Sequence, residues 1–249
     1  MRKNSKPEAS DDRSSAIYRA LRHAIMEQGL APGAKLPEDT IGEQFGVSRT
    51  IVRHVLARLA AEGLVDLRRN HGATVATPSW DEARDTFDVR VAVEERVVSR
   101  LAGKLTKGQI EKLKAHVTAE EAAKGRNEPL SIRLASEFHI LLAEMTGSAV
   151  FSRHVNELAS RCGLLLALYG RPHSSDCAVT EHRDIINALI KGDSARARAV
   201  MTSHLDAVTA RAVIPSAANG DRDLKKVLAR YAANGRAPAK GKRTGKRAE

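Results

Sequence analysis

The stretch GVSRTIVRHVLARLAAEGLV, residues 46–65, decides how the N-terminal part of this chain folds. Ser48 is of a residue type that caps helices and Gly63 of one that ends them, so the sequence predicts a helix from residue 48 to about residue 62. Apolar residues recur along it at helical spacing, which predicts one buried face. The first two turns carry arginines, and residues 48–61 include no acidic residue. A slender basic helix of this kind can enter the major groove of DNA.

The segments around this helix complete a defined order of elements. A helix is predicted to start at Ser14 or Ser15, and a short helix over residues 38–45 is ended by Gly46. After Gly63, the β-prone runs LVDLRR and ATVAT flank an Asn-His-Gly turn, which predicts a small hairpin. Two helices, a tight turn, a third helix and a hairpin form the order of a winged helix-turn-helix.

The side chains at the start of the recognition helix suit contact with DNA. Arg49 and Arg53 can contact guanine bidentately, and Ser48, Thr50 and the amides of the helix N-terminus suit phosphate oxygens. The alternative is that these arginines form an ordinary solvated helix face. The preceding turn and the following hairpin favour the DNA-binding interpretation.

The predicted hairpin tip and the C-terminal tail are both basic. The tip contains Arg69, His71 and Gly72 and is narrow, so we expect it to contact a groove or the phosphates. The alternative is a plain β-hairpin without such contacts. The net charge is +11, but residues 215–249 hold 10 Lys/Arg against 3 Asp/Glu, so most of the excess lies in the tail. The overall charge therefore favours an anionic partner without proving one.

After the hairpin, the sequence predicts helices only. Pro78 and Ser79 mark a linker, and glycines interrupt the helical pattern that follows. The predicted helices are 81–103, 107–124, 128–146, 149–170, 176–191 and 193–213. Helices of these lengths form a bundle. The predicted fold class is therefore mainly α, with an N-terminal winged helix-turn-helix and a C-terminal all-α helical bundle.

The sequence also indicates the cellular compartment. The polar N-terminus is not a signal peptide, and no stretch approaches the ~18 apolar residues of a membrane span. Cys162 and Cys177 form no CxxC pair, which fits buried thiols in a reducing cytosol. We expect a cytoplasmic protein.

Residues 16–77 resemble the DNA-binding domain of GntR-family transcription regulators. The resemblance is carried by LAPGAKLPEDTIGEQFGVSRTIVRHVLARLAAEGLVDLRRNHGATV and is most specific in GVSRTIVRHVL and EGLV. It implies that Arg49, Thr50 and Arg53 read or grip operator DNA, and that His71-Gly72 forms the tip of the wing.

The chain departs from the usual family pattern at three positions of this domain. The family usually has Arg where Asp39 stands, Pro where Ile51 stands and Glu where His54 stands. Asp39 puts one phosphate contact in doubt, whereas His54 is a candidate DNA-binding residue that can alter base preference.

Residues 81–213 resemble the FCD effector domain of the FadR-type branch of GntR regulators. The matching pieces are VRVAVEERVVSRLAG, EFHILLAEMTG and EHRDIINALIKGDSARARAVMTSHL. The resemblance implies a homodimer that binds a palindromic operator and responds to a small effector. We therefore divide the chain into a disordered arm (1–13), a DNA-binding domain (14–77), a linker (78–82), an effector-binding and dimerisation domain (83–213) and a basic, largely disordered tail (214–249). Within the tail, residues 221–233 can form a short helix, and the last segment is expected to be disordered.

Three histidines lie on separate predicted helices: His139, His182 and His204. Imidazoles are common transition-metal ligands and can converge inside a bundle. The resemblance implies a divalent metal such as Zn or Ni at these positions, with an Asp one turn before the first histidine. Ala135 stands there instead, and Glu137 is predicted to face elsewhere. The alternative is three core histidines with local hydrogen bonds.

Arg90 completes the effector pocket that the resemblance implies, together with the three histidines. An Arg fork binds carboxylates well, and the default expectation is a repressor that a small organic acid releases from DNA. The alternative for Arg90 is a surface ion pair with Glu94, one turn away. Two further alternatives concern the whole chain: a DNA-binding protein blind to effectors, and a metal-dependent enzyme. Because no companion general base is evident, we expect no enzyme.

Overall fold

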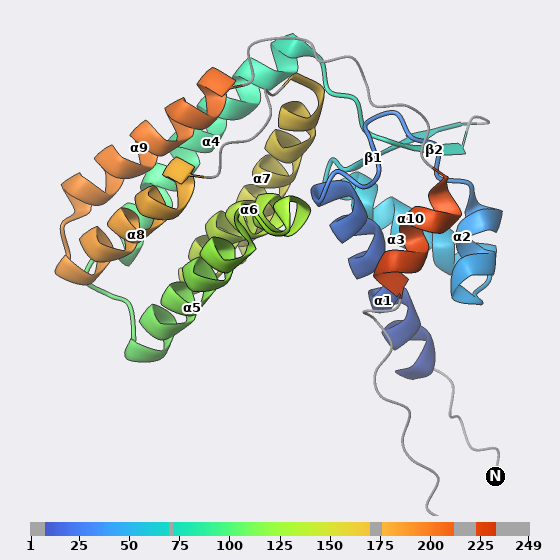
Figure 1. Cartoon of the computed structure of the whole chain (residues 1–249), viewed down its shortest axis with the longest axis horizontal. Coiled ribbons are helices and arrows are strands. Elements are labelled where there is room, and N and C mark those ends of the chain that lie inside the picture. The colour runs from blue at the N-terminus through green and yellow to red at the C-terminus, as the bar shows by residue number, and fades with distance from the viewer. Residues whose placement is uncertain (1–7, 70–71, 170–175, 212–222, 233–249) are drawn as a thin grey trace, which may run out of the picture.

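The computed structural model describes residues 8–69, 72–169, 176–211 and 223–232. It is mainly helical and has two parts, a small N-terminal part with the only described strands and a larger helical bundle (Figure 1). This confirms the predicted fold class. Among the described helices, none has the length and apolar character that crossing a bilayer requires.

The N-terminal part is a winged helix-turn-helix. Its elements are α1 (Glu8–Met26), α2 (Glu38–Phe45), α3 (Arg49–Ala61), β1 (Val65–Arg68) and β2 (Gly72–Val75). The strands pair antiparallel, with Val65 opposite Val75. Their inward residues join one apolar core with the three helices, and this core includes Leu21, Leu56 and Leu64. Gly46 ends α2 in the left-handed region at φ 62°, which a glycine adopts without strain.

Two details of this part differ from the prediction. Helix α1 begins at Glu8 instead of Ser14 or Ser15, so residues 8–13 extend the helix where a disordered arm was expected. Ser48 occupies the N-cap position of α3 with an extended backbone, but its side chain makes no capping hydrogen bond. The hydroxyl of Ser48 is therefore not committed to the helix.

The bundle follows the predicted helices closely. Its elements are α4 (Trp80–Leu101), α5 (Lys107–Ala123), α6 (Glu128–Met145), α7 (Ala149–Tyr169), α8 (Asp176–Lys191) and α9 (Ser194–Arg211). Helix α4 packs against α7 and α9, α5 packs against α6 and α8, and α8 packs against α9. Apolar side chains from all six helices fill the core, among them Val98, Leu113, Phe138, Ile185 and Met201. Helix α7 contributes to this core with its N-terminal half. This arrangement brings residues of α6, α8 and α9 to one point inside the bundle.

A further helix, α10 (Leu224–Ala232), packs on the winged part instead of the bundle (Figure 1). Val227 and Leu228 are buried in the core of the winged part, and the hydroxyl of Tyr231 donates to Glu27 over 2.8 Å. The short helix that the sequence allows over residues 221–233 is therefore present, and the structure adds where it packs. The strong segregation of apolar residues on one face explains why this short segment folds against a surface. The remaining tail, 233–249, lies outside the described residues.

Polar contacts join the winged part to the bundle. Arg22 on α1 donates to Asn156 on α7 over 2.8 Å, and Arg133 on α6 donates to Glu27 on α1 over 2.8 Å. Arg133 also pairs with Glu137, one turn further along α6. Helix α6 therefore contacts the winged part through side chains on the face that points away from the bundle core.

Candidate functional site: a buried histidine cluster and an exposed recognition helix

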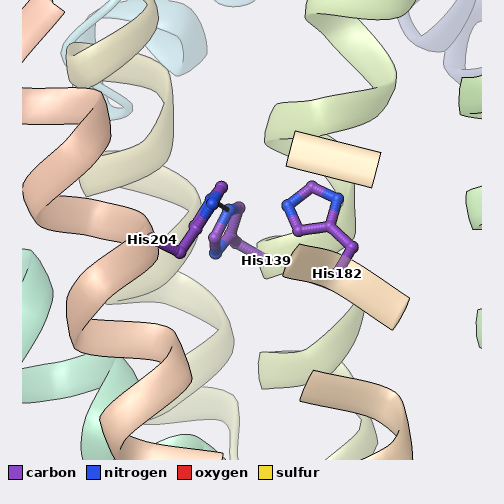
Figure 2. Close-up of side chains that lie close together, drawn as sticks. All are labelled: His139, His182 and His204. Carbon is purple, nitrogen blue, oxygen red and sulfur yellow. Dashed lines mark hydrogen bonds between the residues drawn. The ribbon is translucent and has the colours of Figure 1, made fainter. Parts of the chain in front are cut away.

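His139, His182 and His204 lie together inside the bundle (Figure 2). They come from α6, α8 and α9 and are 2%, 0% and 2% exposed. One nitrogen of each ring lies within 4.8 Å of the corresponding nitrogen of the others. The Nε2 atoms of His139 and His204 are 3.2 Å apart.

A carboxylate holds the other ring nitrogen of each histidine. The Nδ1 atom of His139 lies 2.5 Å from Glu94 of α4, that of His182 lies 2.9 Å from Glu120 of α5, and that of His204 lies 2.6 Å from Glu181 of α8. An ionised carboxylate accepts hydrogen bonds only, so each Nδ1 carries the proton. Each Nε2 of a neutral ring then presents a lone pair toward the common centre.

The Nε2 atoms of the three rings differ in their surroundings. The buried Nε2 of His182 makes no hydrogen bond to any described group. The Nε2 atoms of His139 and His204 can share a hydrogen bond if one of them carries a proton, and they face one another as two lone pairs if neither does. Ligand nitrogens around a tetrahedral zinc lie about 3.3 Å apart, close to the 3.2 Å between these two atoms. The three nitrogens together lie within 4.8 Å of one another, so the donor set is of the kind that binds a divalent metal of the zinc class once the third ring moves closer.

The protonation states support the same conclusion. Burial lowers the pKa of His139 to about 3, with Arg90 acting in the same direction and Glu94 against it. Burial also lowers the pKa of His182, and the neighbouring His204 adds to the effect. Burial opposes ionisation of Glu94, but His139 and Arg90 outweigh it and lower the pKa of Glu94 to about 2. At neutral pH, the imidazoles of His139 and His182 are therefore uncharged and can act as metal ligands, whereas Glu94 is ionised.

Arg90 lies beside this cluster but is already engaged. Its Nε donates to Glu94 over 2.7 Å, and its side chain also hydrogen bonds Cys162. The side chains of Arg90 and Glu94 are 5% and 1% exposed, so the alternative of a surface ion pair was wrong in its location. Burial of the pair next to His139 makes Arg90 a support of the histidine cluster.

The structure also places Ala135 and Glu137. Glu137 pairs with Arg133 and with Arg22 of α1, so it faces the winged part and not the histidines, as its spacing from His139 predicted. Ala135 offers no donor atom. The negative charge near the histidines comes instead from the carboxylates that hold their Nδ1 atoms.

The second candidate site is the exposed face of α3. Five of its predicted DNA-binding residues are solvent-exposed: Ser48, Arg49, Thr50, Arg53 and His54. Arg69 and Gly72 are exposed on the hairpin, whereas His71 lies outside the described residues. The arginines are paired with acidic residues of α2: Arg49 with Asp39 and Arg53 with Glu38. The carboxylate of Glu38 raises the pKa of Arg53 through its hydrogen bond and its charge.

Both parts of the chain match known families. The model of bacterial regulatory proteins of the gntR family matches residues 13–75, and that of the FCD domain matches residues 85–207. A regulator in an unstable DNA locus of Streptomyces ambofaciens is 31% identical over 199 residues, covering 77% of this chain and 81% of the relative. The chain belongs to the GntR family. This GntR protein is also 28% identical over 195 residues to the transcriptional repressor RspR of Escherichia coli K12, covering 78% of this chain and 86% of RspR.

Solved structures of GntR proteins share the fold. E. coli McbR/YncC superimposes with a TM-score of 0.70 at 19% identity, covering 80% of this chain and 95% of that chain. A putative GntR regulator from Rhodococcus sp. RHA1 gives a TM-score of 0.65 at 22% identity, covering 80% of this chain and 96% of that chain. With its GntR and FCD domains, the chain is an effector-responsive, DNA-binding transcription regulator.

Sequence reasoning did not place carboxylates beside the three histidines or beside the arginines of α3. Glu94 was identified only as a partner of Arg90, and Glu120 and Glu181 were not singled out. Glu181 directly precedes His182, but it holds His204 of the next helix, a contact that spacing along one helix does not reveal. Glu38 and Asp39 lie 15 and 10 residues before the arginines they contact. Only the antiparallel packing of bundle helices and the turn between α2 and α3 bring these groups together.

Proposed function

We propose that this GntR-family protein is a homodimeric repressor that releases its operator when a small organic acid binds at a metal held by the three histidines. One observation supports this most: three buried imidazoles from separate helices bring ring nitrogens within 4.8 Å of one another, and a carboxylate lies within hydrogen-bond distance of the Nδ1 atom of each. Hydrogen-bonded histidines of this kind are typical of metal sites, where the outer partner sets the tautomer and ring orientation.

His139, His182 and His204 would hold the cation. The carboxylates of Glu94, Glu120 and Glu181 each lie one hydrogen bond from one of these imidazoles, and Arg90 pairs with Glu94. These carboxylates would favour a cation at the centre, which offsets in part the absence of an acidic ligand at residue 135. A bound Zn²⁺ or Ni²⁺ would supply open coordination positions for a carboxylate of the effector.

The chain itself offers a route from this site to the winged part. Helix α6 carries His139 on its buried face and Arg133 on the face toward α1. A shift of α6 on effector binding therefore changes the contact of Arg133 with Glu27. For coupling to occur, the effector must bind the two arrangements with different affinity.

The DNA-binding half of the proposal rests on the exposed face of α3. In a homodimer, two such helices would read half-sites of a palindromic operator about one helical turn apart. Ser48, Arg49, Thr50, Arg53 and His54 would contact the major groove, with Arg69, His71 and Gly72 at the wing. RspR and the NanR protein of Enterobacter sp. strain 638 are named repressors, which favours repression here.

A thermal-shift screen tests the metal and effector together. The metal-free protein is titrated with Zn²⁺ or Ni²⁺ and then with small organic acids, and the His182→Ala variant is compared with His154→Ala. His154 is an exposed histidine of α7 and serves as a matched control. We expect metal to raise the Tm of the wild type and of His154→Ala but not of His182→Ala. Equal shifts in all three proteins would refute the metal site.

The effector is tested separately by operator binding. An acid that raises Tm only in the presence of metal should also weaken operator binding at fixed salt. If no acid changes either quantity while the operator is still bound, the chain is a regulator blind to effectors.

A further inference from the structure

Two acidic residues of α2 form ion pairs with two arginines of the recognition helix α3. Asp39 accepts hydrogen bonds from Nε and Nη2 of Arg49, the second over 2.7 Å. Glu38 accepts from Nε of Arg53 with both carboxylate oxygens, over 2.9 and 2.8 Å. The pairs are formed across the turn of the helix-turn-helix, and the arginine side chains are 63% and 66% exposed. Both guanidinium groups are therefore held on the surface that faces DNA in this fold.

The atoms used in these pairs decide what the arginines can still do. Nη1 of Arg49 and both Nη groups of Arg53 make no hydrogen bond to any described residue. A guanine is read by two N–H groups of one arginine that donate to O6 and N7. In Arg53 both Nη groups that can perform this reading are uncovered, whereas in Arg49 Asp39 occupies one N–H of Nη2 and leaves Nη1 and the second N–H of Nη2 for a base.

We propose that Asp39 and Glu38 are positioning residues for DNA reading, which hold Arg49 and Arg53 so that their Nη groups meet guanines of the operator. This inference rests on the proposed contact between α3 and the major groove. A long arginine side chain loses rotamer freedom when it binds, and a carboxylate that fixes it beforehand lowers that loss. On bound DNA, these carboxylates would also repel nearby phosphates, which disfavours DNA in which the arginines meet no guanine.

Asp39 gives this arrangement a particular consequence in this chain. Where the resemblance to GntR regulators leads one to expect an arginine on the phosphate backbone, α2 instead carries a group that orients Arg49. The chain thereby lacks a phosphate contact, which would form with any DNA sequence, and has in its place a better-oriented Arg49, whose contact depends on the base. We therefore expect lower affinity for random DNA and a higher ratio of specific to nonspecific binding.

A purely structural role predicts a different outcome. Acidic residues in the first turn of a helix stabilise it through the helix dipole, and the N-cap of α2 is Pro37, which makes no side-chain capping bond. If that were the whole role of Glu38 and Asp39, their replacement would lower Tm and leave base preference unchanged.

The test measures base preference with the full-length protein. Wild type, Asp39→Asn, Glu38→Gln and Asp39→Glu are each used to select binding sequences from a pool of duplexes with a randomised central region, at one salt concentration. The control is Glu43→Gln, an exposed carboxylate of the same helix that pairs with Lys225 of α10 instead of a recognition arginine. Affinity for unselected random duplex and Tm are measured in parallel.

We expect Asp39→Asn and Glu38→Gln each to lose preference for guanine at one position of the half-site by about threefold to tenfold, a part of what one bidentate contact discriminates. Their affinity for random duplex should stay equal or rise. Asp39→Glu, which keeps the carboxylate, and Glu43→Gln should keep the wild-type preference.

Unchanged base preference in Asp39→Asn and Glu38→Gln, with or without a loss of Tm, would overturn the inference and leave operator binding intact. A wild type that selects no sequence at all would refute the proposed function itself, and this inference with it.

Discussion

Replacing Glu120 by Gln is the sharpest perturbation of the histidine cluster. The side chains of Glu120 and His182 are both 0% exposed, and Nδ1 of His182 lies 2.9 Å from the carboxylate. The substitution keeps the size of the side chain and removes its charge. The amide can also donate to Nδ1, which would move the imidazole proton to Nε2 and remove the lone pair that faces the centre.

The magnitude follows from the burial of this pair. A hydrogen bond to an ionised partner is roughly twice as strong as one between neutral groups, and solvent cannot replace it at a position that is 0% exposed. Loss of an outer partner of a metal-bound histidine reduces metal affinity by about 10- to 100-fold, or about 1.4–2.7 kcal/mol. Glu181, whose side chain is 27% exposed, should give a smaller effect when replaced by Gln.

The assay is competition for Zn²⁺ against a chromophoric chelator at constant pH, with circular dichroism to verify folding. Glu121→Gln is the matched control, because Glu121 is the next residue of α5, loses the same charge and pairs with Arg183 on the surface, where its side chain is 50% exposed. If Glu120→Gln and Glu121→Gln bind zinc with the same affinity as the wild type, the carboxylates do not orient the histidines and the reasoning is wrong.

Three further predictions concern stability and DNA binding. In metal-free protein, folding favours the neutral forms of His139 and His182, because burial lowers the pKa of both. The free energy of unfolding should therefore fall as pH decreases below ~6.5, by up to about 1.4 kcal/mol per pH unit for each histidine. A free energy of unfolding, measured in urea, that does not change from pH 7 to 5 would contradict this. Leu228→Ala, which empties a buried position of α10 in the winged part, should cost about 2–5 kcal/mol in urea unfolding, and the exposed Lys226→Ala almost nothing; equal effects would show that α10 does not stabilise this part. Arg53→Ala should weaken operator binding at fixed salt by about 1–3 kcal/mol; unchanged binding would exclude α3 as the reading helix.

The helices and the hairpin could be predicted because local signals coincide with them. Gly46 and Gly63 end α2 and α3 with positive φ angles, and the β-prone runs around the Asn-His-Gly turn pair as predicted. In the bundle, the glycines that interrupt the pattern, such as Gly125 and Gly147, also adopt positive φ just after a helix. These features act over a few residues, so the sequence contains them directly.

Helix α10 could be predicted as a helix but not placed. Its apolar face is evident from the sequence, but nothing in the local pattern says which surface covers it. The structure buries Val227 and Leu228 against α1, about two hundred residues earlier in the chain, and not against the bundle that directly precedes them. A contact of this sequence separation depends on the whole fold.

The charge around the histidine cluster could not be predicted from local sequence patterns either. From the sequence, Ala135 meant a missing anionic ligand and hence a weakened metal site. That expectation treated charge as a property of the ligand atoms alone, whereas in a buried site the nearby charges act over several ångströms in a medium of low dielectric constant. Glu94, Glu120 and Glu181 surround the three imidazoles, and Arg90 pairs with Glu94. Carboxylates that favour a divalent cation therefore lie one hydrogen bond behind the candidate ligands, on helices whose packing no single motif describes.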